Sequence, residues 1–122
     1  MARPSLFEFL HHTKITDYDE DLNLDLAADV LVMPLTNPMI TKTTGGDAEA
    51  WTLADGEPGQ TLVIYLSVDG GGSGTLTPAT ASNWATILFA DAGDQAFLFY
   101  VNDTIGWIII SVFGLTAQPT VA

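Results

Sequence analysis

The residues of this chain best suited to metal chemistry form an acidic run near the N-terminus. Oxygen-bearing side chains occupy alternate positions, at Asp17, Asp19, Asp21, Asn23 and Asp25, as at the start of an EF-hand calcium loop. The remainder of such a loop is missing, because leucine stands where the sharp-turn glycine belongs and alanine where the closing glutamate belongs. The run therefore predicts a solvated acidic segment and no metal centre. A weak surface calcium site is the alternative.

Two carboxylates that lie close together, Asp91 and Asp94, suggest a second chemistry. A pair of carboxyl groups can hydrolyse a glycosidic bond when a cleft holds them on either side of a sugar. One of the pair must then be buried enough to raise its pKa. Here both acids flank a glycine, in a pattern typical of side chains that accept hydrogen bonds from the turn backbone. We therefore expect a turn, with a small glycan-directed enzyme as the remote alternative.

Nucleophilic and zinc chemistry have equally little support. The two histidines, His11 and His12, are adjacent and point in different directions in any regular structure. The chain has no cysteine, so a zinc site would need distant carboxylates. No serine stands in a G-x-S-x-G nucleophile elbow. We accordingly predict no enzymatic activity, no catalytic residue and no cofactor.

The glycine-rich stretch at residues 69–74, DGGGSG, lacks the Gly-Lys-Ser/Thr ending of a phosphate-binding loop. It predicts either a mobile hairpin tip or a point where another backbone approaches closely.

These groups are distributed over a pattern of short strands. Apolar, β-branched runs at residues 48–53, 60–68, 74–77, 85–89, 96–101 and 107–112 are separated by Gly, Asp, Pro and Asn turns, with 39–43 as a possible leading strand. Such regular spacing predicts an all-β fold, namely a small antiparallel β-sandwich or barrel. We place this domain at residues 46–122.

Two of these strands are apolar on both sides. Phe97 and Phe99 alternate with Leu98 and Tyr100, and the strand that begins at Trp107 contains three consecutive isoleucines. A strand with one face in solvent should show one polar side. We therefore predict that a subunit interface covers part of this surface, formed by Trp84, Phe97, Phe99 and Trp107. Stacking of a sugar on an exposed tryptophan is the alternative, and Trp84 suits it best.

Residues 1–45 differ in composition and predict an extended N-terminal arm. The segment contains both histidines and much of the acidic charge, and Leu22, Leu24 and Leu26 alternate with polar residues. An arm of this kind becomes ordered against a partner. Its expected apolar anchors are Leu6, Phe7, Phe9, Leu22, Leu24 and Leu26.

The charge of the chain is strongly acidic. It has 122 residues and a formal net charge of -12, and no basic residue follows Lys42. Such a surface repels phosphate groups, so we expect binding to neither nucleic acid nor an anionic membrane surface. No segment is long and apolar enough for a membrane span. Nearly half of the residues are hydrophobic and no disulfide can form, which favours oligomerisation.

One order of motifs resembles a known family. The pattern W-x-L-x-D-G at residues 51–56, followed by G-Q, D-G-G-G, T-x-T-P, I-x-F-x-D-A-G-D and G-W-I-I-I at residues 106–110, resembles a β module of virion structural proteins in tailed bacteriophages. That family includes head decoration (cement) proteins. The resemblance covers roughly the C-terminal two-thirds of the chain, and residues 1–43 lie outside it.

The resemblance implies a virion component assembled in the host cytoplasm. We expect a capsid decoration protein that binds the major capsid protein, forms a homotrimer and stabilises the assembled head shell. The alternative is a tail or fibre component with an adaptor or receptor-binding role.

Overall fold

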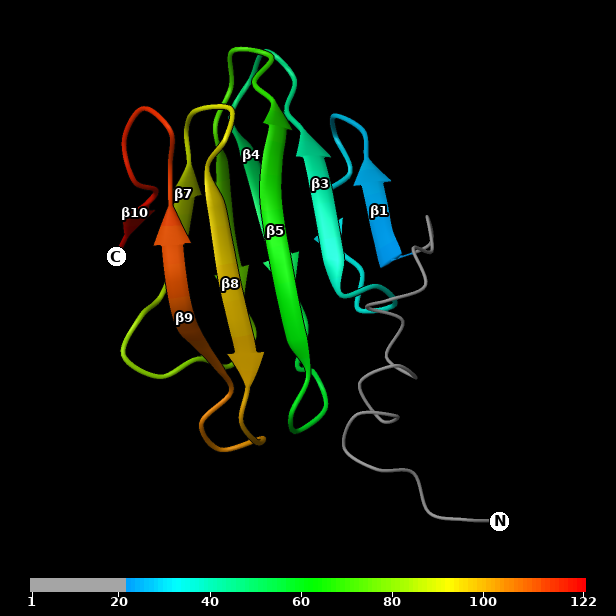
Figure 1. Ribbon diagram of the computed structural model, residues 1–122, viewed down its shortest axis with the longest axis vertical. Coiled ribbons are helices and arrows are strands. Elements are labelled where there is room, and N and C mark those ends of the chain that lie inside the picture. The colour runs from blue at the N-terminus through cyan, green and yellow to red at the C-terminus, as the bar shows by residue number, and fades with distance from the viewer. Residues whose placement is uncertain (1–21) are drawn as a thin grey trace, which may run out of the picture.

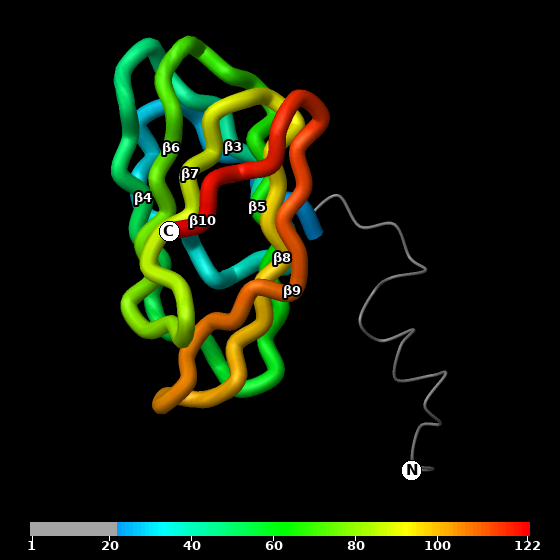
Figure 2. The backbone as a smooth tube through the Cα atoms, turned by 90° about the vertical axis from the view of Figure 1, so that its left-hand side faces the viewer, coloured from blue at the N-terminus to red at the C-terminus, as the bar shows by residue number. Residues whose placement is uncertain are grey.

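The computed structural model describes residues 22–122, which form two β-sheets packed face to face (Figures 1 and 2). The ten strands are β1 (Asn23–Leu26), β2 (Val32–Met33), β3 (Met39–Thr43), β4 (Glu49–Leu53), β5 (Thr61–Val68), β6 (Gly74–Pro78), β7 (Ile87–Phe89), β8 (Gln95–Tyr100), β9 (Trp107–Phe113) and β10 (Thr120–Val121). The front sheet in Figure 1 has the order β1-β3-β5-β8-β9, and the rear sheet has the order β10-β7-β6-β4-β2. The prediction of an all-β fold is confirmed, with a sandwich as its form.

The expected antiparallel pairing is found in only part of each sheet, because both sheets are mixed. From β1 to β6 the chain alternates between the two sheets, so consecutive strands of one sheet run in the same direction. The pairs β1–β3, β3–β5, β2–β4 and β4–β6 are therefore parallel. Only β7 to β10 add antiparallel pairs. We call residues 22–78 the parallel half and residues 79–122 the antiparallel half.

The prediction of an arm up to residue 45 is wrong for residues 22–45. This segment contains β1, β2 and β3, and β3 lies between β1 and β5 in the front sheet. Leu26, Met33 and Ile40 are part of the hydrophobic core. The alternation of leucines at residues 22–26 indicates a strand with one buried side. These leucines are covered by the chain itself and need no partner protein to become ordered.

The core lies between the sheets and follows the two-residue period of the strands. In β4 the buried residues Glu49, Trp51 and Leu53 alternate with exposed ones. The Trp51 ring lies 5.2 Å from that of Phe89, and Tyr100 meets Trp107 edge-on at 5.2 Å. Aromatic pairs at this spacing add to the stabilisation that burial itself provides.

The glycine-rich loop at residues 69–74 is packed against a neighbouring backbone. The Gly72 amide donates to the Gly45 carbonyl at 2.8 Å, and the Gly70 amide donates to the Thr44 hydroxyl at 3.2 Å. A Cβ at Gly70 would overlap the Thr44 carbonyl oxygen. The prediction of a close backbone approach is confirmed, and it ties the β5–β6 connection to the β3–β4 connection.

Candidate functional site

The outer face of the front sheet, which is turned toward the viewer in Figure 1, carries several apolar side chains of β5, β8 and β9. The inner residues of β8 are Ala96, Leu98 and Tyr100, so Phe97 and Phe99 must point outward. Their cross-strand partners on the same face are Val63 on β5 and Ile108 on β9. Phe113 on β9 lies opposite Gln95 and belongs to the same outer face. We call Val63, Phe97, Phe99, Ile108 and Phe113 the aromatic face.

Charged residues are absent from the outer surface of β3, β5, β8 and β9, the four strands that carry or flank the aromatic face. Their other outward or exposed residues are uncharged: threonine, serine, glutamine, methionine or tyrosine, together with the exposed Ile110 on β9 and Val68 at the end of β5. Within the strands of the front sheet the one acid is Asp25, on the edge strand β1, where its Oδ1 accepts a hydrogen bond from Thr41 Oγ1 at 2.9 Å. The exposed or half-buried acids elsewhere in residues 22–122 lie in loops, at Asp29, Asp47, Asp55, Glu57, Asp69, Asp91 and Asp103. The face is thus neutral on a strongly acidic molecule.

The four residues predicted at a subunit interface occupy different environments. Phe97 is 38% exposed and Phe99 is half-buried, so both remain available on the aromatic face. Trp107 is fully buried, and its Nε1 donates to the Ala54 carbonyl at 2.9 Å. Its prediction as an interface residue is wrong, because the sandwich's own core already covers it.

Trp84 packs on the edge of the same core. It is partly buried, and its Nε1 donates to the Trp107 carbonyl at 2.9 Å. The indole therefore fastens residues 80–84 to the start of β9. This fixed position makes Trp84 a structural contact and leaves little of its ring for a sugar or a neighbouring subunit.

The six predicted anchors of the arm also separate into groups. Leu6, Phe7 and Phe9 lie outside the described residues. Leu26 belongs to the core and Leu24 packs against it, so their prediction as partner anchors is wrong. Leu22 precedes β1 and is half-buried.

The sequence analysis missed a buried ion pair at one end of the sandwich. Lys42 Nζ lies 2.8 Å from Glu49 Oε1, and the two side chains are 0% and 3% exposed. Lys42 Nζ also donates to the carbonyls of Ala27 and Thr43. The ammonium lies 5.3 Å from the centroid of the Trp51 ring. One side chain thus joins the β1–β2 connection, β3 and β4.

Glu49 is satisfied on both carboxylate oxygens. Trp51 Nε1 donates to Oε1 at 2.9 Å, and the Gly45 amide donates to Oε2 at 2.8 Å. Burial alone would raise the pKa of Glu49, but the hydrogen bonds from Lys42, Gly45, Trp51 and the Asp29 amide together lower that pKa from 4.5 to about 2. Donors aimed at a charged carboxylate stabilise its ionised form. A sequence signal did exist, because Lys42 alternates with the apolar Ile40 and so shares its inward side.

The opposite end of the sandwich contains a buried phenol. The Tyr100 hydroxyl donates to Asp103 Oδ1 at 2.6 Å. This hydrogen bond, together with burial and the charges of Asp103, Asp55 and Glu57, raises the pKa of Tyr100 to about 12. The phenol therefore stays protonated in neutral solution and closes the hairpin between β8 and β9.

Asp91 and Asp94 form a turn, as the sequence predicts. Asp94 is 1% exposed, and its Oδ2 accepts hydrogen bonds from the amides of Ala90 and Asp91 at 2.9 and 3.1 Å. Its Oδ1 has no hydrogen-bond partner among the described residues. The two acids thus contribute to the local turn and do not face each other across a cleft.

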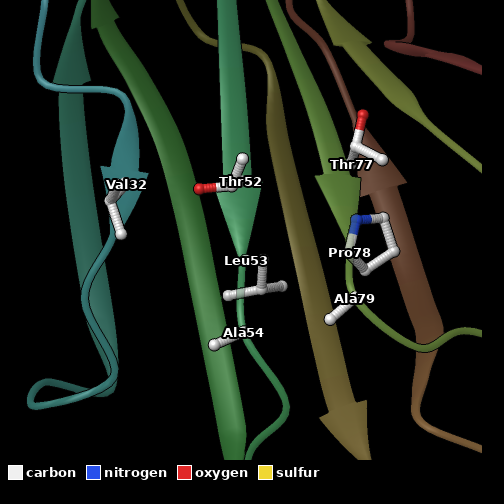
Figure 3. A pocket seen from close by; sticks show the side chains of 7 residues that line it. All are labelled: Val32, Thr52, Leu53, Ala54, Thr77, Pro78 and Ala79. Carbon is white, nitrogen blue, oxygen red and sulfur yellow. The ribbon is translucent and has the colours of Figure 1, made fainter.

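A shallow groove of about 370 Å³ lies on the rear sheet (Figure 3). Its lining residues come from the ends of β2, β4 and β6 and are Val32, Thr52, Leu53, Ala54, Thr77, Pro78 and Ala79. These groups are apolar or carry a single hydroxyl, so the groove suits an uncharged group.

Within residues 22–122, no three histidine, cysteine or acidic side chains gather in a way that would hold a metal ion. Asp17, Asp19 and Asp21 of the predicted acidic segment lie outside these residues. The same range contains no helix that is long and apolar enough to cross a membrane.

No protein-family model matches the chain, and no curated protein matches it significantly.

Proposed function

We propose that this chain is a structural protein of a tailed-phage virion, which decorates the head and stabilises the assembled shell. The order of motifs at residues 51–110 carries the proposal, since it resembles the β module of such proteins. The described architecture is compatible with it, because a small β-sandwich with an uncharged face and acidic loops is suited to contact with other subunits.

Its mechanism is linkage between binding and assembly. A protein that binds the assembled shell, and not the separated major capsid proteins, stabilises the shell by its binding free energy at every occupied site. The chain acts as a homotrimer in this proposal. Leu6, Phe7 and Phe9 are the proposed anchors on the capsid, since Leu24 and Leu26 are committed to the core.

A binding experiment tests this function directly. Purified chain is mixed with isolated heads from which minor proteins have been removed, the heads are sedimented, and the bound copies are counted. We expect saturable binding of many copies per head and a higher melting temperature of the decorated shell. Few or no copies would contradict the decoration role and favour the tail or fibre alternative.

A matched pair of variants locates the contact. The triple substitution Leu6→Ser, Phe7→Ser and Phe9→Ser is expected to abolish binding to heads. Ile105→Ser is the control, because Ile105 is an exposed apolar residue on the β8–β9 hairpin. Unchanged binding by the triple variant would exclude the proposed anchors.

A further inference from the structure

We propose that a second copy of this chain packs against the aromatic face, so that this face of each copy turns toward their common symmetry axis. The inference rests on the homotrimer of the proposed function and names the surface that forms it; its test uses the purified chain alone, so its failure is distinguishable from a failure to bind phage heads.

The first argument is the exposure of large apolar groups in one place. Phe97 is 38% exposed and Phe113 is 51% exposed, and Val63, Phe99 and Ile108 beside them are half-buried. Contiguous apolar surface of this kind marks an interaction site on a soluble protein. The outer side of the rear sheet carries threonines at Thr52, Thr75 and Thr77 on β4 and β6, and its exposed valines, Val32 and Val121, lie apart on the two edge strands β2 and β10.

The distribution of charge identifies the occupant. A basic partner would be drawn to the acidic loops, not to a neutral sheet face. A second copy has the same net charge of -12 and is repelled by every loop that carries exposed acids. The aromatic face is the surface through which two such copies approach with least repulsion, and contact there removes apolar groups from water on both sides.

A second copy is hindered from adding a strand at the edge of β9, so we infer that it contacts the aromatic face. The Trp107 amide donates to the Thr80 carbonyl, and the Trp107 carbonyl accepts from the Trp84 indole, so the start of this edge is already occupied. The register between β8 and β9 also shifts between Phe97 and Leu98. A bulge of this kind disrupts the regular ladder that an added strand requires. Copies therefore pack sheet on sheet.

Sedimentation velocity on the full-length chain over a concentration series tests the proposal. We expect a reversible oligomer, and we expect added salt to strengthen the association by screening the acidic loops. Phe97→Asp and Phe113→Asp should each raise the dissociation constant about 30-fold or more, as truncation of a central interface residue does. Val32→Asp is the control, because Val32 is 65% exposed but lies on the rear sheet.

Two outward substitutions keep the test valid if one variant fails to fold, and circular dichroism with thermal melting identifies such a failure. A chain that sediments as a monomer at every concentration would overturn the proposal. So would an oligomer that dissociates with Val32→Asp but survives both face substitutions.

Discussion

In the parallel half of the sandwich, residues 22–78, a buried ion pair joins connections that are distant in sequence, whereas the antiparallel half, residues 79–122, is joined by turns, apolar packing and hydrogen bonds from neutral indole and amide groups. Lys42 and Glu49 join three chain segments in the parallel half. The antiparallel half contains the β8–β9 hairpin, closed by the Val101 amide at the Gly106 carbonyl.

The difference follows from topology. A hairpin fixes the register of its two strands through the turn itself. Parallel neighbours have no such turn, because the chain visits the other sheet between them. The Lys42–Glu49 pair joins β3 to β4 in the opposite sheet, and the Lys42 ammonium also donates to the Ala27 carbonyl just after β1. A buried ion pair with few satisfactory positions can thus fix how these segments lie relative to one another. The arrangement of strands in the parallel half therefore depends on a few polar atoms. The antiparallel half, in contrast, carries apolar side chains that remain exposed.

Breaking the ion pair is expected to have the largest effect. Lys42→Met leaves the Glu49 carboxylate buried without its cation, which should lower the free energy of unfolding by about 3–5 kcal/mol. Urea denaturation measures this loss. Hydrogen exchange should show the loss of protection in β1 to β4 before β8 and β9.

The double variant Lys42→Met with Glu49→Gln is the matched control, because a neutral amide can still accept the hydrogen bond from Trp51. It should recover part of the stability. If Lys42→Met alone unfolds no more easily than the wild type, the ion pair does not hold the parallel half together.

Gly74→Ala tests the packing between β6 and β4. A Cβ at Gly74 would overlap the six-membered ring of Trp51, and Trp51 is fully buried. Overpacking of this kind should lower the free energy of unfolding by about 3 kcal/mol. Gly59→Ala is the control of the same type, since nothing lies within 4 Å of its Cβ position, although its φ of +89° gives a smaller cost of its own. Equal melting temperatures for the two variants would contradict this account.

Some strands could be predicted from the sequence and others could not, and this difference also follows from topology. The strands β4 to β9 were predictable, because turn residues separate apolar runs of strand length. The strand β2 was not, since two residues carry too little periodicity. The alternation of leucines in β1 was visible, but it was assigned to an arm because the partner strand β3 could not be identified. Parallel pairing could not be predicted either, because the hydrogen bonding between β1 and β3 does not produce a recognisable pattern in the local sequence.

The candidate site shows the same division. Phe97 and Phe99 could be placed on one side of a strand by alternation alone. Whether the chain itself would cover Trp107 depended on its contact with Ala54, which is distant in sequence. The partner of Lys42 was likewise out of reach, because its pairing with Glu49 depends on the arrangement of β3 and β4 in opposite sheets.

Acid titration is expected to destabilise the parallel half, because Glu49 belongs to that half. Its pKa is about 2 in the folded chain against 4.5 ordinarily, so the folded state favours the ionised form. The resulting stabilisation is fully present above pH 4.5 and is lost as the pH falls from 4.5 toward 2. After allowance for solvent screening, it amounts to about 2 kcal/mol. Urea denaturation at several pH values measures it, and Glu49→Gln should flatten the dependence in this window. An unchanged slope in Glu49→Gln would assign the acid sensitivity to other carboxylates.

The smallest effect is expected at the hairpin of the antiparallel half, where a single phenol takes the place of the ion pair. The hydrogen bond to Asp103 holds the pKa of Tyr100 at about 12, against 10.0 ordinarily. The protonated phenol stabilises the fold fully below pH 10, and this contribution is lost as the pH rises from 10 toward 12. Asp103→Asn removes the charge and should move the titration of Tyr100 back toward 10, measured by carbon NMR of the tyrosine ring. A titration of Tyr100 that Asp103→Asn leaves unchanged would show that burial, and not this hydrogen bond, sets its pKa, and the antiparallel half would then contain no polar counterpart of the Lys42–Glu49 pair.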